Sequence, residues 1–210
     1  MCTPSRMSRT FFFILAFCSA RTIIAVVYWI ESYPLTYWGE WYHYEECPPG
    51  SYAYGFQLRV QEFMDSPFTD DTALNGIFLL CATPDARRAG YEMFGPFDYT
   101  PPIAKVSSGV ALNGKVLQEW QCSSPHFATG FEFRALESQG ILFDDVAATN
   151  MILECGYGER LLGDGEDVGV WTTDLTCRRG VVCGIQTQVE YGKTDDTALN
   201  NVKFGCCDPV

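Results

Sequence analysis

The chain has 210 residues, of which 47% are hydrophobic and 19% charged, so it can fold around a buried core. Its formal net charge is −12, which disfavours nucleic-acid binding, because a protein that binds phosphates needs Lys and Arg to replace their counterions. An acidic surface suits a soluble extracellular protein that associates with basic proteins.

The first twenty residues predict a secretory signal peptide. Arg6 and Arg9 precede an apolar run, Phe11–Phe17, and residues 18–20 are small enough for a cleavage site. The alternative is an uncleaved signal anchor, because a second apolar run follows Arg21.

Arg21 separates the two apolar runs, and neither approaches the roughly 20 residues that a membrane-spanning helix needs. We therefore expect an extracellular, secreted protein without a stable membrane anchor. Residues 21–37 would form a lead segment before the folded domain.

The chain after residue 20 contains an even number of cysteines, which in a secreted protein predicts a full set of disulfide bonds. These cysteines are Cys47, Cys81, Cys122, Cys155, Cys177, Cys183, Cys206 and Cys207. The sequence has no Cys-x-x-Cys pair, and its histidines are His43 and His126, so we expect no metal site.

A recurring motif organises the rest of the chain. The sequence Asp-Asp-Thr-Ala-Leu-Asn occupies residues 70–75 and recurs at 195–200. A diverged copy at 144–150 carries either one extra residue or one substitution shifted along the chain. Each copy is followed by an apolar run that ends in a cysteine, so the sequence predicts a repeat architecture.

We expect one domain over residues 38–207, built from three repeats at about 38–81, 116–155 and 168–207. The intervening residues 82–114 contain several Pro and Gly residues and are expected to form long loops. No amphipathic helix of three turns is expected after the signal peptide.

Apolar and polar residues alternate within each repeat. Phe56, Leu58 and Val60 share one face of a segment whose other face carries Gln57 and Arg59. This alternation predicts half-buried strands, so each repeat would supply a small antiparallel sheet with one apolar face. Three such sheets around a common axis would bury all three faces. A two-sheet sandwich or barrel is the alternative.

The repeated aspartates and asparagines are predicted turn residues, because their side chains cap nearby backbone groups. They are Asp70, Asp71, Asn75, Asp144, Asp145, Asn150, Asp195, Asp196 and Asn200. A glycosidase would need two carboxyl groups roughly 5–10 Å apart across a sugar, whereas adjacent residues on an extended segment point to opposite faces. A calcium site would need about six oxygen ligands, and no spaced Asp-x-Asp-x-Asp loop is present.

Three blocks resemble the vitelline membrane outer layer protein 1 family. They are Trp-Gly-Glu-Trp at 38–41, Cys-Pro-Pro-Gly at 47–50 with the Asp-Asp-Thr-Ala-Leu-Asn unit after it, and Val-Cys-Gly-Ile-Gln-Thr-Gln-Val-Glu at 182–190. The resemblance implies an all-β fold: a disulfide-stapled β-prism of three antiparallel sheets with pseudo-threefold symmetry. It also implies secretion into an egg's outer coat or another extracellular layer.

The resemblance makes Trp38, Trp41 and Trp171 candidate binding residues, with core packing as the alternative role. Val116 stands six residues before Cys122, where repeats one and three have Trp41 and Trp171, and Val168 stands where Trp38 would align, so a symmetric set of tryptophans is incomplete. The middle repeat also lacks the Cys-Pro-x-Gly block, because Cys122 is followed by Ser-Ser-Pro. We therefore do not expect three equal sites.

The repeat geometry suggests disulfide bonds between Cys47 and Cys81 and between Cys122 and Cys155. The pairing of the four cysteines in the third repeat stays open.

The sequence thus favours a non-enzymatic structural component of an extracellular coat or matrix, without a cofactor. Its expected partners are other coat or matrix proteins, basic ones in particular. A lectin-like module that binds oligosaccharides is the alternative. A saccharide transferase or hydrolase would need two carboxylates that converge in one pocket, and the sequence names no such pair.

Overall fold

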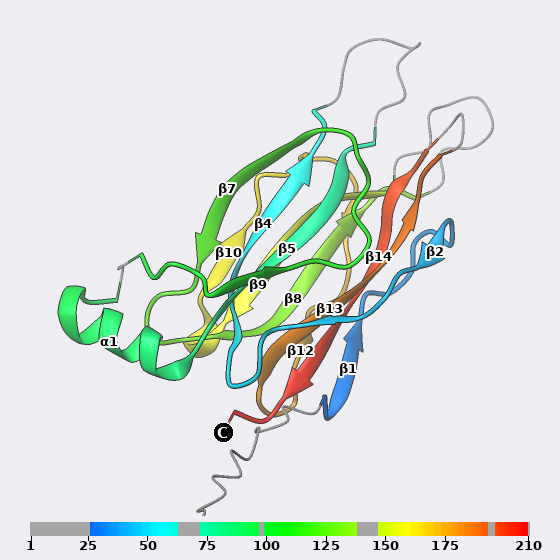
Figure 1. Cartoon of the computed structure of the whole chain (residues 1–210). Helices are drawn as coiled ribbons and strands as arrows, with labels where there is room; N and C mark the ends of the chain where they lie inside the picture. Colours follow the sequence, from blue (N-terminus) through cyan, green and yellow to red (C-terminus); the bar gives the residue numbers. More distant parts are fainter. Residues whose placement is uncertain (1–25, 63–71, 97–98, 138–146, 193–195, 210) are drawn as a thin grey trace, which may run out of the picture.

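The computed structural model describes residues 26–62, 72–96, 99–137, 147–192 and 196–209. They form three antiparallel sheets that pack against one another as the sides of a prism (Figure 1). The all-β, three-sheet fold predicted from the repeats is confirmed. The predicted signal peptide lies outside the described residues, as do Asp70, Asp71, Asp144, Asp145 and Asp195.

Each sheet has a central hairpin with an edge strand on either side. Sheet A contains the hairpin β13 (Val181–Glu190) and β14 (Ala198–Cys207), with β1 (Tyr28–Glu31) on one side and β2 (Glu40–Trp41) and β3 (Glu45–Glu46) on the other. Sheet B contains β4 (Tyr52–Val60) and β5 (Leu74–Ala82), flanked by β6 (Ala104–Val106) and β7 (Lys115–Gln121). Sheet C contains β8 (Ala128–Ala135) and β9 (Ala148–Cys155), flanked by β10 (Arg160–Leu162) and by β11 (Val170–Trp171) and β12 (Leu175–Thr176).

Successive repeats exchange edge strands. Strand β7 of the second repeat pairs with β4 of the first, and β11 and β12 of the third repeat pair with β8 of the second. Strands β2 and β3 of the first repeat pair with β13 of the third. Each sheet therefore combines two repeats, rather than one as the sequence suggested, and the exchange closes the ring.

Strand β1 belongs to the folded domain, although it lies in the segment that we expected to precede it. It pairs in antiparallel register with β14 from Tyr28 opposite Cys206 to Glu31 opposite Lys203, so the first and last described strands lie side by side in sheet A (Figure 1). Alternation of Trp29 and Glu31 with the inward-facing Ile30 could have indicated a strand here.

The apolar faces of the three hairpins form one core. Phe56, Leu58, Ile185 and Phe204 are all at most 1% exposed, and the rings of Phe131 and Phe204 lie 4.6 Å apart across the boundary between sheets C and A. Side chains buried this completely contribute about 3–5 kcal/mol each when they are aromatic. The alternation predicted from the sequence is therefore the pattern that assembles the prism.

All three hairpins carry a β-bulge at the same place, just before a glycine. The bulged residues are Tyr54, Thr129 and Cys183, which occupy equivalent positions in β4, β8 and β13. Tyr54 and Cys183 lie outside the central core, each in a smaller buried cluster. The bulged residue thus packs in a different cluster in sheet A than in sheet B.

Three disulfide bonds connect the sheets in a cycle. Cys47–Cys81 links the end of β3 in sheet A to β5 in sheet B, and Cys122–Cys155 links β7 in sheet B to β9 in sheet C. Cys177–Cys206 completes the cycle between sheets C and A. The fourth bond, Cys183–Cys207, lies within the hairpin of sheet A and uses the bulged residue of that hairpin.

A helix, α1 (Pro84–Phe94), occupies part of the segment that we expected to be loops. The prediction that no helix of three turns is present was therefore wrong. The helix begins with a Thr83 cap, whose hydroxyl accepts a hydrogen bond from the amide of Ala86, and it has Pro84 at its first position. It projects from one end of the sheets (Figure 1), and a one-turn 3₁₀ helix, η1 (Gly156–Gly158), lies in the corresponding connection of sheet C.

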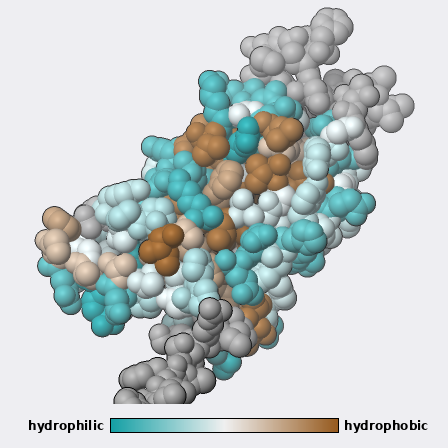
Figure 2. All heavy atoms as spheres, in the orientation of Figure 1, coloured by the Kyte–Doolittle hydropathy of each residue, from teal (hydrophilic) through white to brown (hydrophobic). Residues whose placement is uncertain are grey.

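The face shown in Figure 2 is mainly hydrophilic, with apolar residues in separate groups between the polar ones. Within the described parts of the chain, no helix has the length and the apolar character needed to cross a bilayer.

Candidate functional site

The three tryptophans predicted to bind a ligand do not converge. Trp41 lies on β2 of sheet A and Trp171 on β11 of sheet C, while Trp38 precedes β2. All three are partly buried.

Two of these rings are already covered by a cation. The Lys203 ammonium lies 4.0 Å from the ring centre of Trp41, and the Arg134 guanidinium lies 5.3 Å from that of Trp171. Such contacts stabilise an exposed pair by about 0.5–1 kcal/mol. Val116 pairs with Arg59 at the third equivalent position, where no aromatic ring is available. These contacts favour a packing role for Trp41 and Trp171 on the outer faces of the sheets over a role in ligand binding.

The middle repeat also differs from the other two at a position where they carry a glutamine. Gln57 donates a hydrogen bond of 2.5 Å to the carbonyl oxygen of Leu117, and Gln186 donates one of 2.7 Å to that of Tyr42. Each glutamine thereby attaches an edge strand contributed by another repeat. Sheet C has Glu132 at this position, and a carboxylate cannot donate in the same way.

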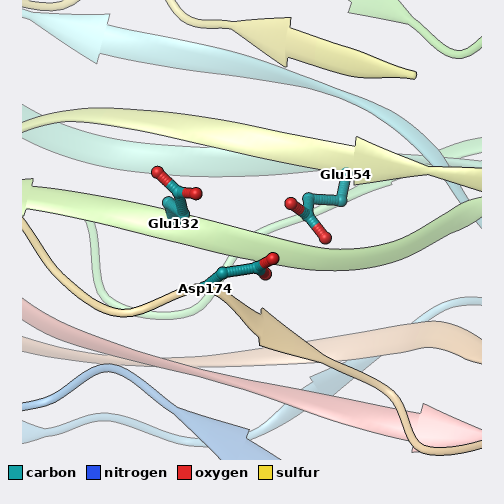
Figure 3. Close-up of side chains that lie close together, drawn as sticks. All are labelled: Glu132, Glu154 and Asp174. Carbon is teal, nitrogen blue, oxygen red and sulfur yellow. The ribbon is translucent and has the colours of Figure 1, made fainter. Parts of the chain in front are cut away.

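Glu132 instead belongs to a cluster of three acidic side chains on the outer side of sheet C (Figure 3). Glu132 on β8, Glu154 on β9 and Asp174 before β12 have carboxylate oxygens within 4.8 Å of one another. The Arg160 guanidinium on β10 forms ion pairs with both glutamates, at 3.6 Å from Glu154. The single hydroxyl hydrogen of Thr176 is shared between Glu154 at 3.2 Å and Asp174 at 3.3 Å.

Burial is the main cause that raises the pKa of Glu154, and the nearby negative charge of Asp174 raises it further. Hydrogen bonding from Thr176 and the charge of Arg160 lower the pKa but do not outweigh these effects. A carboxyl with a raised pKa beside an ionised one is an arrangement found in acid–base catalysis. Here, however, the same guanidinium holds both glutamates.

The carboxylate cluster does not offer a complete set of ligands for a metal ion. Three carboxylates supply part of the six to eight oxygens that Ca²⁺ prefers, and a cation would have to compete with Arg160 for two of them. The geometry is better explained as a local ion-pair network that attaches β10 and the β12 edge to sheet C.

The edges of neighbouring sheets meet at three junctions, and hydrogen bonds cross each of them. At the junction of sheets B and C, Asp164 accepts hydrogen bonds from the Trp120 indole at 3.0 Å and from Gln118 at 3.3 Å. At the junction of sheets A and B, Ser108 donates to the carbonyl of His43 at 2.6 Å, and Gly109 packs against the ring of Tyr42.

The junction of sheets A and C is more open. The Tyr28 hydroxyl joins its two walls at one end, through hydrogen bonds to the backbone of Arg179. Beside this contact lies a hollow of about 650 Å³, which shares Glu31 and Leu175 with a second hollow of about 400 Å³. We call the two together the A–C groove; residues 28–34 form one wall and residues 173–178 the other. Two smaller hollows at the B–C junction measure about 220 and 170 Å³.

Trp29 is one of the aromatic residues that line the A–C groove, together with Tyr28 and Tyr33. Its side chain is 42% exposed, and its ring meets the ring of Tyr44 edge to face at 4.4 Å. Glycines make room for Tyr44, because a Cβ on Gly184 or Gly205 would lie 2.2 or 2.6 Å from its hydroxyl oxygen. Sequence reasoning missed Trp29 because it assigned residues 21–37 to a lead segment.

The predicted turn residues have different roles in the three repeats. Asn75 and Asn200 lie within β5 and β14, but their amides donate to the hydroxyls of Thr72 and Thr197, at 2.8 and 2.7 Å. Both amides also reach the carbonyl of an alanine with a positive φ, Ala73 at 44° or Ala198 at 50°. Asp196 accepts a hydrogen bond from the amide of Gly192.

Asn150 does not repeat this arrangement. The pairing of β8 with β9 places Thr149 in the bulge that Asn75 and Asn200 occupy in the other hairpins, and Asn150 lies one position further along. The Asn150 side chain accepts a hydrogen bond from the next amide, that of Met151. Of the two alternatives for the diverged motif at 144–150, the strand register therefore agrees with a substitution shifted along the chain and not with an extra residue.

Comparison with known proteins identifies one family along nearly all of the described chain. The family model "Vitelline membrane outer layer protein I (VOMI)" matches residues 28–209. A human protein named "Vitelline membrane outer layer protein 1 homolog" is 35% identical over 175 residues, which cover 81% of this chain and 78% of that protein. The mouse protein of the same name is 32% identical over 175 residues, with the same coverage.

A solved lectin structure shares the fold at low sequence identity. A prostate-specific WGA16 glycoprotein lectin superposes with a TM-score of 0.52 and 10% identity, over 86% of this chain and 99% of the lectin. A single-chain recombinant jacalin superposes with a TM-score of 0.47 and 9% identity, over 85% of this chain and 93% of jacalin.

Proposed function

Because this chain belongs to the vitelline membrane outer layer protein I family, we propose that it is a secreted structural component of an extracellular coat of the egg outer-layer type. The observation that supports this proposal is the family match over residues 28–209. The cycle of three inter-sheet disulfides agrees with it, since such bonds persist in oxidising, extracellular compartments.

A non-enzymatic role fits the outer side of sheet C better than catalysis does. The two glutamates there lie as close together as the carboxyl pair of a glycosidase, but both are bound to Arg160. We therefore assign the cluster a structural role in the proposed coat protein.

The proposed partners are basic proteins of the same coat or matrix. The formal net charge of −12 supports them, because an acidic surface attracts cationic partners over about 8–10 Å at physiological salt.

Secretion and charge-driven association can be tested together. The full chain, expressed in cultured animal cells, should appear in the medium with its disulfides formed. The purified protein should bind cytochrome c, used as a basic probe, at low salt. It should bind acetylated cytochrome c, whose lysine charges are neutralised, much more weakly. Retention of the chain inside the cell, or equal binding to both probes, would contradict the proposal.

Saccharide binding is the second candidate function. The fold shared with the WGA16 glycoprotein lectin agrees with it, and the partly exposed Trp29 in the A–C groove favours it specifically. A coat protein with this second function would bind both the proteins and the saccharide chains of the coat.

A further inference from the structure

The A–C groove differs from the equivalent places on the other two sides of the prism. At the position of Trp29 on β1, sheet B has Lys105 on β6 and sheet C has Arg160 on β10, as the register of each edge strand with its hairpin shows. Lys105 lies 2.6 Å from Glu119, and Arg160 is paired with two glutamates, so both cations are neutralised within their own sheets. The pseudo-threefold symmetry therefore acts as an internal control: of the three equivalent edge-strand positions, the one at the A–C junction carries an aromatic ring and the other two carry a neutralised cation.

The groove has the shape and lining of a site for a chain-like ligand. Its two hollows of about 650 and 400 Å³ adjoin at Glu31 and Leu175, which line both, and small-ligand sites usually occupy about 300–1,000 Å³. Trp29 is 42% exposed and Tyr33 68% exposed, and they lie on the same wall. Hydroxyl and charged groups face them from the other wall: Thr173, Asp174, Thr176 and Arg178.

The charges along the groove nearly balance. Glu31 is paired with Lys203 at 3.2 Å, and Asp174 stands on the same wall as Arg178. A strongly basic peptide would find no excess of negative charge here, and an anionic ligand no excess of positive charge. Aromatic surfaces beside mixed hydrogen-bond donors and acceptors suit a neutral ligand that has apolar faces and many hydroxyl groups.

We infer that the A–C groove binds a neutral oligosaccharide, with a sugar ring against Trp29, a neighbouring unit near Tyr33, and hydroxyl groups bonded to Asp174, Thr176 and Arg178. This inference rests on the second candidate function and gives that function a location. Trp29 is a fixed platform, because it packs on Tyr44 over the space left by Gly205.

The test measures oligosaccharide binding to the full oxidised protein by calorimetry, with chitopentaose, cellopentaose and mannopentaose as probes at concentrations up to about 10 mM, which detects even weak affinity. Trp29→Ala and Tyr33→Ala should each weaken binding of the preferred probe about tenfold or more. Tyr157→Ala is the matched control, because Tyr157 is 95% exposed but lies outside the groove, against His126. It should bind as the unaltered protein does.

Tyr33→Ala also guards against misfolding, since a side chain 68% exposed contributes little to the core. Binding that all three variants retain would place the saccharide site elsewhere and overturn the inference. Equal loss in Tyr33→Ala and Tyr157→Ala would show non-specific adhesion to exposed tyrosines and overturn it as well. No binding of any probe by the correctly oxidised protein would reject saccharide binding itself, while leaving the coat role to its own test.

Discussion

Arg87 and the acidic residues of the outer sheet faces show how single side chains distinguish the repeats. Arg87 on α1 is fully buried, and its guanidinium packs on the ring of Tyr54 and donates hydrogen bonds to the backbone of Cys122 and His126. The repeat pattern correctly predicted the buried apolar positions. It could not predict Arg87, because this contact depends on an insertion that occurs in one repeat.

Replacement of Arg87 by alanine should lower the free energy of unfolding by about 3 kcal/mol, because it leaves buried carbonyl groups without a donor. Urea unfolding measures this change. Arg88→Ala is the matched control, because Arg88 is the exposed neighbour on the same helix, and it should change stability by less than about 0.5 kcal/mol. Similar effects of both substitutions would contradict the assigned role of Arg87.

Glu154 and Glu119 should respond to pH with opposite signs. Burial is the main cause that raises the pKa of Glu154 in the folded protein, and the charge of Asp174 is the second. Ionisation of Glu154 therefore lowers the stability of the folded protein as pH rises above the ordinary pKa of a glutamate. A hydrogen bond from Lys105 is the main cause that lowers the pKa of Glu119. Ionised Glu119 therefore stabilises the folded protein above the ordinary pKa of a glutamate, and this stabilisation is lost as pH falls.

Glu154→Gln should therefore be more stable, relative to the unaltered protein, at pH 7 than at about pH 3.5, where a glutamate is largely protonated. Glu119→Gln should be less stable at pH 7 and should approach the unaltered protein at the lower pH. Urea midpoints at the two values provide the comparison. The same sign for both variants at pH 7 would show that the electrostatic environments are misassigned.

The strands, the helix and the disulfide bonds were not equally predictable. Period-two alternation located the hairpin strands, because burial of one face determines that pattern. Edge strands such as β2 have only two residues and carry no pattern of their own. The helix α1 was overlooked, although the order Thr83, Pro84 and Asp85 is a common signal for the start of a helix. The groove could not be predicted, because its walls come from opposite ends of the sequence.

The disulfide bonds allow a test at the scale of these elements. Cys183→Ser with Cys207→Ser removes the bond within sheet A, which spans 24 residues, and should cost about 3 kcal/mol while leaving the A–C groove formed. Cys177→Ser with Cys206→Ser removes a bond of similar span, 29 residues, that joins sheets A and C. It should cost a similar amount and also impair the groove.

Urea unfolding and the oligosaccharide assay, applied to both double variants, separate these effects. Equal retention of binding in the two variants would show that the bond between sheets A and C is not needed to hold the groove walls in place.

At the scale of the whole molecule, the prism is closed by pairing between its first described strands and its last hairpin. Sheet A contains strands from residues 28–46 and from residues 181–207, and the first and last strands pair with each other. The pairings of β1, β2 and β3 with the C-terminal hairpin connect residues more than 130 positions apart. The repeats predicted three sheets but not this closure, because the exchange of edge strands depends on the assembled ring.

Removal of β1, by joining a signal peptide directly to Ser32, tests the closure. The deletion exposes the edge of β14 and removes Ile30, which is 8% exposed in the core, so stability should fall by at least about 2 kcal/mol. Thermal unfolding of the oxidised protein measures the loss. Unchanged stability would show that β1 is dispensable and that the folded domain begins near Trp38, as the sequence suggested.

The most direct test of the proposed coat function is retention of the labelled, oxidised protein by an isolated egg outer coat. The coat is washed at physiological salt, and the protein that remains is compared with a sample whose disulfides have been reduced and blocked. The proposal predicts that the folded protein is retained in a saturable manner and that the reduced sample is largely washed away. Complete recovery of the folded protein in the wash would contradict a structural role in the coat.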